Sequence, residues 1–394
     1  MPRPSARVLA LPDYPLGKLP ERKRELIARG VDVIDLGAGD ADLAPPDVAV
    51  RRLAEAAAMS PMSRYGFGTG LVEYRQAVTR FMLRRFGIAF DAMREVVPLI
   101  GSKEGISHLA LAYAEEGDTT IIPEPGYLAY LGGTQLGGAE PYRYALKPGN
   151  GFLVDLDEIP REVLDRTRIL YLNYPNNPTA AIAPISYLEE MVQRCRELDI
   201  LLVYDNAYSE MAFDGYMPPS IFEVDGARHV AIEFHSMSKT FNMTGWRCGW
   251  AVGSADLIAP LVRVKSFIDT GAFMAVQAAA AAALDDAESF VAGNVSVFKE
   301  RRDAAVTAFR DNGFACSTPM ATMYLWIALP GNIPSAAFAE SLMEEEGVIV
   351  LPGSSLGVGG EGFFRVSFVT SPDRIREAAL RAGKVLARMG AAAK

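Results

Sequence analysis

Residues 235–250 read HSMSKTFNMTGWRCGW, and they directly follow the apolar run HVAIEF. That run has the composition of a buried strand, so Lys239 stands just beyond a strand end, near Ser236, Ser238 and Arg247. An apolar setting and a neighbouring cation both disfavour the ammonium and favour the neutral amine that forms a Schiff base. The hydroxyls and the guanidinium suit a phosphate group. Taken alone, the stretch also fits a solvated lysine that happens to follow a strand.

Further apolar runs alternate with helical patterns through the middle of the chain. They are VVPLI (96–100), TTIIP (119–123), RILYL (168–172), ILLVY (200–204) and CGWAVG (248–253). Most are apolar throughout, which is typical of strands buried on both faces of a mainly parallel sheet. The helical pattern at 185–198 begins with Ser186 and Glu189, spaced as a capping box. We therefore predict an α/β fold in which helices sandwich a mainly parallel sheet.

The pattern changes after about residue 285. A long helical stretch (287–312) is followed by a helix near 335–346, a Gly-rich loop, the run FFRVSF and a final helix from 371. This order is typical of a smaller α+β unit. We predict a large domain over 46–285, and a small domain formed by 1–45 with 286–394.

Polar residues follow two of the predicted buried strands. Asp205, in LLVYDNAYSE, is expected at the carboxyl end of its strand, where open α/β sheets bind ligands. A buried carboxylate needs a partner, and a protonated pyridine nitrogen would serve; the alternative is a turn residue that caps the next helix. Asn177, in YLNYPNNPTAA, has an amide that can bind a ring hydroxyl or a carboxylate, or is part of a plain turn.

Two more segments carry charge in an otherwise apolar context. In LIGSKEGI, a strand leads into Gly101, Ser102 and Lys103, which open a helix and so offer backbone N–H groups to an anion. Arg365, in FFRVSF, is flanked by apolar residues, and a carboxylate partner would account for a charge there.

Composition excludes several classes of function. The 394 residues carry a net charge of -9 with no cluster of Lys or Arg, which argues against nucleic acid as a partner. Three cysteines and three histidines show no metal-ligand spacing, so we expect no metal site. No apolar stretch approaches the ~20 residues that a membrane helix requires. We expect a protein of the reducing cytoplasm.

Together, in this order and at these spacings, the segments resemble the fold-type I pyridoxal-phosphate aminotransferases of classes I and II over nearly the whole chain. The interval of eight from Lys239 to Arg247 and that of three from Asp205 to Tyr208 both match the family. The resemblance implies an aspartate-aminotransferase-like large domain that binds pyridoxal 5′-phosphate, and a small domain that closes over the substrate.

The resemblance implies a role for each matching residue. Lys239 would be the Schiff-base lysine and would carry the proton, Asp205 would face the pyridine nitrogen, and Tyr208 would hold the ring hydroxyl. The implied cofactor-binding set is Gly101, Ser102, Lys103, Tyr127, Asn177, Asp205, Tyr208, Ser236, Ser238, Lys239 and Arg247. Tyr65, in SRYGFGTG, would reach the phosphate of a neighbouring subunit, which implies a homodimer with shared active sites. The implied substrate-binding set is Gly39, Lys103, Asn177 and Arg365.

Three segments are most similar to the LL-diaminopimelate aminotransferase branch: IEFHSMSKTFNMTGWR, LNYPNNPTAA and IDTGAFMAVQ. Three residues depart from that branch. Thr69 stands where a glutamate often holds the distal ammonium of the substrate, Met274 stands where glutamine is frequent, and Ala41 replaces the proline of GDPD. These departures affect the choice of substrate and leave the cofactor residues unchanged.

The expected function is transfer of an amino group between an L-amino acid and a 2-oxo acid, with 2-oxoglutarate as acceptor and diaminopimelate as candidate donor in lysine biosynthesis. An alanine- or aspartate-type enzyme, a broad-specificity enzyme and a β-lyase on the same fold are the alternatives. A dinucleotide-dependent oxidoreductase is disfavoured because YGFGTG and GSSLGVGGEG lack the strand and the acidic residue of that fingerprint. A regulatory protein is disfavoured because the chain has no spare ~60–100 residues for a DNA-binding domain.

Overall fold

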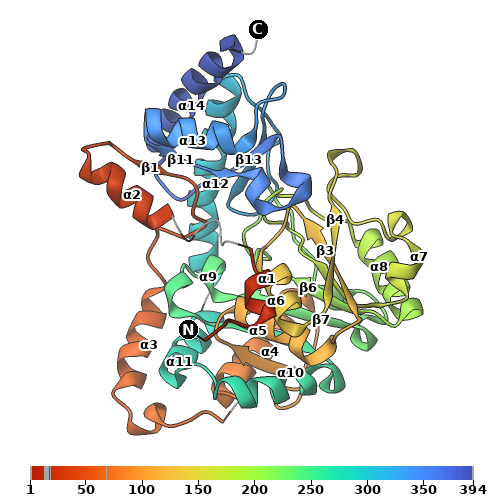
Figure 1. Ribbon diagram of the computed structural model, residues 1–394. Coiled ribbons are helices and arrows are strands. Elements are labelled where there is room, and N and C mark those ends of the chain that lie inside the picture. The colour runs from red at the N-terminus through yellow and green to blue at the C-terminus, as the bar shows by residue number, and fades with distance from the viewer. Residues whose placement is uncertain (1, 13–16, 18, 68, 287, 393–394) are drawn as a thin grey trace.

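The computed structural model describes residues 2–12, 17, 19–67, 69–286 and 288–392, with the backbone alone at 391 and 392 (Figure 1). Its centre is a seven-stranded sheet in the spatial order β2-β8-β7-β6-β5-β3-β4. The strands are β2 (Val96–Leu99), β3 (Thr119–Glu124), β4 (Glu140–Ala145), β5 (Thr167–Leu172), β6 (Leu201–Asp205), β7 (Ala231–Ser236) and β8 (Gly249–Gly253). All neighbours pair in parallel except β8, which is antiparallel to both β2 and β7.

Helices cover both faces of this sheet. On β6, Leu201 and Val203 belong to the apolar cluster that includes residues of α5, α6 and α10, whereas Leu202 and Tyr204 belong to the one that includes residues of α4, α8 and α11. The helices of the first face are α5 (Ser102–Tyr113), α6 (Ala129–Gly137) and α10 (Ala255–Ile268), and those of the second are α4 (Val72–Phe86), α8 (Ile185–Leu198) and α11 (Met274–Asp285). Because successive side chains on a strand point to opposite faces, both faces must be apolar. The predicted α/β fold is confirmed.

A second body contains the C-terminal elements, gathered at the top of Figure 1. They are α12 (Glu288–Asp311), β9 (Ala315–Cys316), β10 (Tyr324–Ala328), α13 (Ser335–Glu346), β11 (Val348–Ile349), β12 (Leu351–Pro352), β13 (Phe363–Ser367) and α14 (Pro372–Ala392). Strands β12-β13-β10-β9 form an antiparallel sheet, and β1 (Ile34–Asp35) pairs in parallel with β11.

The N-terminal elements do not all pack on the C-terminal body as β1 does. Helix α1 (Ala6–Ala10) lies against α6, where Gln135 Nε2 donates to the carbonyl of Ala10 at 3.2 Å. Helix α2 (Leu19–Ala28) is tied to α13 by Arg22, and α3 (Asp47–Ala57) packs against α11. The short helices α7 (Arg161–Leu164) and α9 (Met237–Thr240) complete the set. The predicted domain boundaries stay a prediction.

Two local expectations need correction. Helix α8 begins at Ile185 with Pro184 as N-cap and no side-chain cap, so the predicted capping box of Ser186 and Glu189 is wrong. Ser186 already lies inside the first turn, two residues after the N-cap position. Strand β4 was not expected, because it is a partly exposed edge strand with polar residues and no continuous apolar run. Among the described helices, none combines the length and the apolar character needed to cross a bilayer.

The antiparallel strand β8 brings two strand ends together at Gly249. This residue pairs with Leu99 of β2 on one side and with Ser236 of β7 on the other. A Cβ atom at position 249 would lie 2.6 Å from the His235 carbonyl oxygen and 3.0 Å from the Ser102 nitrogen, both backbone atoms. The absent side chain therefore lets the turn after β2 approach the turn after β7.

Gly249→Ala should force these backbone segments apart and lower the free energy of unfolding by about 1–3 kcal/mol, as overpacked interiors do. Chemical denaturation of the cofactor-free protein measures the change. The matched control is Gly149→Ala, where a Cβ meets nothing within 4 Å, and it should stay within about 0.5 kcal/mol of wild type. Equal stability of the two variants would show that the close approach at Gly249 is not constrained.

Candidate active site

A cavity of about 320 Å³ lies at the carboxyl ends of β5, β6 and β7, beside the start of α5. Such a strand edge is where open α/β sheets bind ligands. The cavity is lined by Gly39, Ser102, Lys103, Gly126, Tyr127, Leu128, Asn173, Asn177, Asp205, Ala207, Tyr208, Ser236, Ser238, Lys239, Thr244, Arg247, Tyr324, Leu351, Leu356 and Arg365. Twelve side chains or glycines predicted from separate segments of the sequence thus line one cavity.

One end of the cavity collects hydrogen-bond donors. Helix α5 begins at Ser102, after Gly101 in a conformation with φ of +71° that favours glycine. A side chain on Gly101 would collide with the guanidinium of Arg247, so the missing Cβ leaves room for that group. The N–H groups of a helix start, serine hydroxyls and a guanidinium are the donors that a phosphate group requires. We call Gly101, Ser102, Lys103, Ser236 and Arg247 the anion cup.

Lys239 lies on the single-turn helix α9, which follows β7 directly. Ser236 caps this turn, because its hydroxyl oxygen accepts the N–H of Ser238 at 3.2 Å. The cap fixes the direction in which the chain leaves the strand. The Lys239 amine donates a hydrogen bond to the Gly39 carbonyl, so the N-terminal segment lies against this lysine.

Asp205 is a buried carboxylate with one satisfied oxygen. Its Oδ2 accepts the Tyr130 hydroxyl at 2.8 Å, while Oδ1 has no hydrogen-bond partner among the described residues. Burial raises the pKa of Asp205 to about 6, against smaller lowering effects of the Tyr130 hydrogen bond and of His235. Tyr130 is itself fixed by stacking on Tyr171, with ring centroids 4.8 Å apart. The free oxygen therefore calls for a buried donor or cation.

Asn177 and Arg365 meet across the cavity. One guanidinium nitrogen of Arg365 donates to Asn177 Oδ1 at 2.8 Å, and another donates to the Gly37 carbonyl at 2.7 Å. Because Oδ1 is the acceptor in this bond, the amide nitrogen of Asn177 is the group that can donate to a ligand. Asn173 supports the turn, since its Oδ1 accepts the Asn177 N–H at 2.8 Å and its amide donates to the Asp205 carbonyl at 2.7 Å.

Two buried tyrosines form the wall between Lys239 and Arg365. The Tyr208 hydroxyl donates to the Tyr324 hydroxyl at 3.0 Å, and the Arg365 guanidinium lies 4.2 Å from the Tyr324 ring centre. Burial raises the pKa of Tyr208. At Tyr324 burial acts in the same direction, but the positive charges of Lys239 and Arg365 outweigh it and lower the pKa. Tyr208 is therefore the donor of the pair, and Tyr324 the acceptor.

The residues present fit pyridoxal phosphate. The unpaired buried oxygen of Asp205 suits a protonated ring nitrogen, the anion cup suits the phosphate, and Lys239 supplies an amine between them. The ring centroids of Tyr127 and Tyr130 are 5.7 Å apart in an edge-to-face arrangement. Tyr127 also lines the cavity, so its ring can pack against a bound aromatic group.

Two predicted residues are not among those that line the cavity: Gly101, which precedes Ser102 at the start of α5, and Tyr65. The side chain of Tyr65 is 71% exposed, next to Phe67, and its role toward a neighbouring subunit stays a prediction. Sequence reasoning missed Tyr130, Tyr324 and Asn173. Tyr130 lies three residues after Tyr127, a spacing that places two residues on one side of a helical turn, and this was an available signal.

The chain is similar to known aminotransferases over most of its length. The family model described as aminotransferase class I and II matches residues 31–381. An LL-diaminopimelate aminotransferase of Moorella thermoacetica is 44% identical over 383 residues, covering 97% of this chain and 98% of that protein. One from Desulforudis audaxviator shows the same identity and coverage.

Solved structures of other proteins have a similar fold over nearly the whole chain. Substrate-bound BacF from Bacillus subtilis is 32% identical, with a TM-score of 0.94 and coverage of 98% of each chain. A probable N-succinyldiaminopimelate aminotransferase from Thermus thermophilus is 34% identical, with a TM-score of 0.88 and coverage of 93% of this chain and 98% of that chain.

The buried carboxylate makes a pH-dependent prediction. The pKa of Asp205 is raised from 3.8 to about 6, so the folded cofactor-free protein loses stability as pH rises through that range. Asp205→Asn removes the buried charge, so its free energy of unfolding at about pH 8 should be about 3 kcal/mol higher than that of wild type. The difference should close as the pH falls toward about 4.

Denaturant unfolding of both cofactor-free proteins at a series of pH values measures this difference. The exposed Asp373→Asn variant is the control and should follow wild type throughout. A gap between Asp205→Asn and wild type that stays constant with pH would contradict titration of Asp205 as its cause.

Proposed function

The chain belongs to the class I and II aminotransferases, and on that premise we propose that it transfers the amino group of LL-diaminopimelate to 2-oxoglutarate in lysine biosynthesis. It is a pyridoxal-phosphate-dependent enzyme. The observation that carries the choice of donor is the 44% identity to LL-diaminopimelate aminotransferases over 97% of the chain. The buried Arg365 guanidinium, aimed at the same cavity as Lys239, supports an α-amino acid as substrate.

The cofactor, when bound, supplies an electron sink that stabilises negative charge at the substrate Cα. In our proposal the anion cup holds its phosphate, and Asp205 accepts a hydrogen bond from its ring nitrogen through Oδ1. Tyr208 and the amide nitrogen of Asn177 hold its ring hydroxyl. Tyr130 acts through Asp205, because it fixes the other carboxylate oxygen.

Lys239 is the proposed catalytic base and acid. Its amine stands at the end of a single turn fixed by Ser236, and it lines the cavity together with Tyr208 and Tyr324. A neutral amine at this position would accept the proton of the substrate Cα and hold it for return to the reacting group. Its present contact with the Gly39 carbonyl shows that the side chain reaches the N-terminal segment that lines the substrate side.

The substrate carboxylate is the proposed ligand of Arg365. Arg365 is 4% exposed and its guanidinium contacts Gly37 and Asn177, so it is already oriented for a planar anion. Gly39 and Asn177 complete this end. Lys103 lines the cavity as a member of the anion cup, and it is also the proposed partner of a distal carboxylate.

The three departures from the diaminopimelate branch do not line this cavity. Thr69 lies on the exposed loop after Tyr65, and Ala41 packs against the apolar core of the C-terminal body. Met274 begins α11 beside Gly66. In our proposal Thr69 and Met274 act, with the Tyr65 loop, toward the site of a neighbouring subunit.

One observation favours a second class of donor. Asp205 is the sole acidic side chain among the described cavity-lining residues, while Leu128, Leu351 and Leu356 give part of the wall an apolar character. Such a wall suits an amino acid with an apolar or aromatic side chain. An enzyme of broad specificity is therefore the alternative, followed by an alanine- or aspartate-type enzyme and by a β-lyase.

We further propose a cytoplasmic homodimer with shared sites. Phe267 is 87% exposed and Phe67 is 77% exposed. Phe267 and the exposed Ile268 end α10, and the loop that follows leads to the exposed Phe273 at the start of α11. Phe67 shares a second loop with the exposed Tyr65. The carbonyl of Thr270 would lie 3.7 Å from a Cβ at Gly66, so these loops are neighbours. Clustered exposed aromatic residues mark a protein interface. The three cysteines are unpaired, which suits a reducing compartment.

The donor is identified by titrating amino acids into the loaded enzyme and following the change of the cofactor spectrum from its aldehyde to its amine form. LL-diaminopimelate should convert the enzyme at lower concentration than alanine, aspartate, glutamate or phenylalanine. Lys239→Ala is the control and should convert with none of them. Conversion by phenylalanine but not by diaminopimelate would favour the second class of donor, and pyruvate release without an acceptor would indicate a β-lyase.

Shared sites predict complementation between two impaired variants. Lys239→Ala and Tyr65→Ala should each be weak as homodimers. After mixing, exchange of subunits should restore about a quarter of wild-type activity, because half of the dimers are then mixed and each mixed dimer has one intact site. Activity that stays at the sum of the two variants, despite subunit exchange measured by mass spectrometry, would place Tyr65 outside the neighbour's site.

A further inference from the structure

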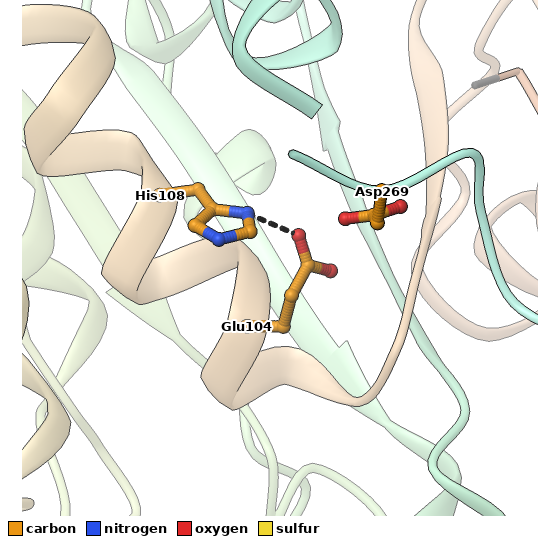
Figure 2. Close-up of side chains that lie close together, drawn as sticks. All are labelled: Glu104, His108 and Asp269. Atoms are coloured by element: carbon orange, nitrogen blue, oxygen red, sulfur yellow. Dashed lines mark ion pairs between the residues drawn. The ribbon is translucent and has the colours of Figure 1, made fainter. Parts of the chain in front are cut away.

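A buried charge cluster lies directly behind the anion cup. Lys265 of α10 is fully buried, and its ammonium donates to both oxygens of Glu104, at 2.9 Å each. It also donates to both oxygens of Asp269, at 3.2 and 3.1 Å. His108 completes the cluster, with Nδ1 2.5 Å from Glu104 Oε1, as Figure 2 shows. None of these four side chains lines the cavity.

Glu104 belongs to the turn that carries the cup. It lies in the first turn of α5, two residues after Ser102, and its Oε2 accepts the N–H of Ile100 at 3.1 Å. The carboxylate thus links Ile100 to the first turn of α5. This link fixes the direction in which the N–H groups at the start of that helix point. This contact requires an acceptor oxygen but does not itself require a charge.

The charge on Glu104 opposes the function of the cup. A carboxylate in the first turn of a helix occupies the positive end of the helix dipole, which is also the end that attracts a phosphate. Asp269 adds a second negative charge. Two carboxylates close to a phosphate dianion weaken its binding unless a cation offsets them. Lys265, placed on both carboxylates and shielded from water, is that cation.

The cluster does not offer a metal site as it stands. Glu104, His108 and Asp269 bring three ligand atoms within 4.8 Å of one another. The Lys265 ammonium contacts both carboxylates, however, so their negative charge is already compensated. A divalent cation at the same place would stand against this ammonium, which disfavours it.

Asp269 extends the same network to the loop that carries Tyr65. Its Oδ1 accepts the N–H of Gly271 at 2.8 Å. One residue on, the carbonyl of Ala272 accepts the amide of Gln277 at 2.7 Å, and the Oε1 of Gln277 accepts the N–H of Leu71 at 2.7 Å. Gln277 is fully buried, so these bonds are protected from water.

We propose that Lys265 is a positioning residue for the cofactor phosphate: its ammonium neutralises Glu104 behind the anion cup and, through Asp269 and Gln277, holds the Tyr65 loop in register with it. The inference rests on the proposed placement of the phosphate in the cup. It predicts that loss of the ammonium affects recognition of the phosphate group more than recognition of the rest of the cofactor.

The test compares affinities for pyridoxal phosphate and for pyridoxal, which lacks the phosphate, in the full-length protein after cofactor removal. Lys265→Met keeps the length of the side chain and removes its charge. We expect pyridoxal phosphate to bind ~10-fold more weakly or worse, because two uncompensated carboxylates then face the phosphate. Affinity for pyridoxal should change less than ~3-fold, and inorganic phosphate should compete less well.

Charge-matched variants separate this effect from general damage. Lys265→Met combined with Glu104→Gln removes one of the two opposing charges and keeps an acceptor for Ile100, and it should restore part of the preference for the phosphorylated ligand. Arg302 is the matched control, because it is also a buried cation held between two carboxylates, Asp214 and Asp303. Arg302→Met should leave the preference unchanged, whatever it does to stability.

Hydrogen exchange tests the second half of the proposal. In Lys265→Met the amides of Ile100, Gly271 and Leu71 should exchange faster than in wild type and in Arg302→Met. If Lys265→Met does not fold, Glu104→Gln alone decides, since Lys265 then still faces Asp269. It should bind inorganic phosphate at least as tightly as wild type, and a loss of ~10-fold would overturn the role assigned to the charge.

The outcomes distinguish this inference from the placement of the phosphate. Arg247→Ala, which changes the cup itself, should abolish the preference for pyridoxal phosphate over pyridoxal. If Arg247→Ala keeps that preference, the phosphate lies elsewhere, and both proposals fail. If Arg247→Ala loses it while Lys265→Met retains it, the cup is correct and Lys265 has a structural role alone.

Discussion

Burial of the Asp205 carboxylate at the end of β6 is the constraint on which the site depends. An ionised group that lacks water needs a compensating partner, and the chain supplies one for a single oxygen, through Tyr130. In our proposal, the other oxygen gains a partner when the protonated ring nitrogen of the cofactor is bound. The protein thus retains an unfavourable buried group, and in our proposal the bound cofactor offsets its cost. Asn173 links this strand end to the neighbouring turn through the Asp205 carbonyl.

Much of the site was predictable because its residues follow recognisable strands. Asp205 comes directly after an apolar run, and Lys239 and Asn177 each come five residues after one. In a parallel sheet such strand ends meet at one edge. Strand β4 was missed because it lies at the edge and lacks a continuous apolar run. The predicted cap of α8 is wrong because Pro184 is the N-cap, two residues before the serine that the pattern indicates. Local patterns located the chemistry better than the exact ends of elements.

The residues that sequence reasoning missed act through contacts between distant segments. Tyr324 lies 116 positions from Tyr208, and Lys265 lies 161 positions from Glu104. Neither has a local pattern that sets it apart from an ordinary core tyrosine or a helix lysine. Their importance comes from burial and charge compensation, which exist after the helices have packed on the sheet. Such residues can be identified from the folded structure but not from the sequence.

Arg365 lies where separate parts of the chain meet. It donates to Gly37, next to the short strand that pairs with β11, and to Asn177, which follows a strand of the large sheet. Both segments must therefore be in place before the guanidinium has its observed direction. If Arg365 binds the substrate carboxylate as we propose, recognition of the substrate depends on the correct assembly of both bodies of the protein and not on a single side chain.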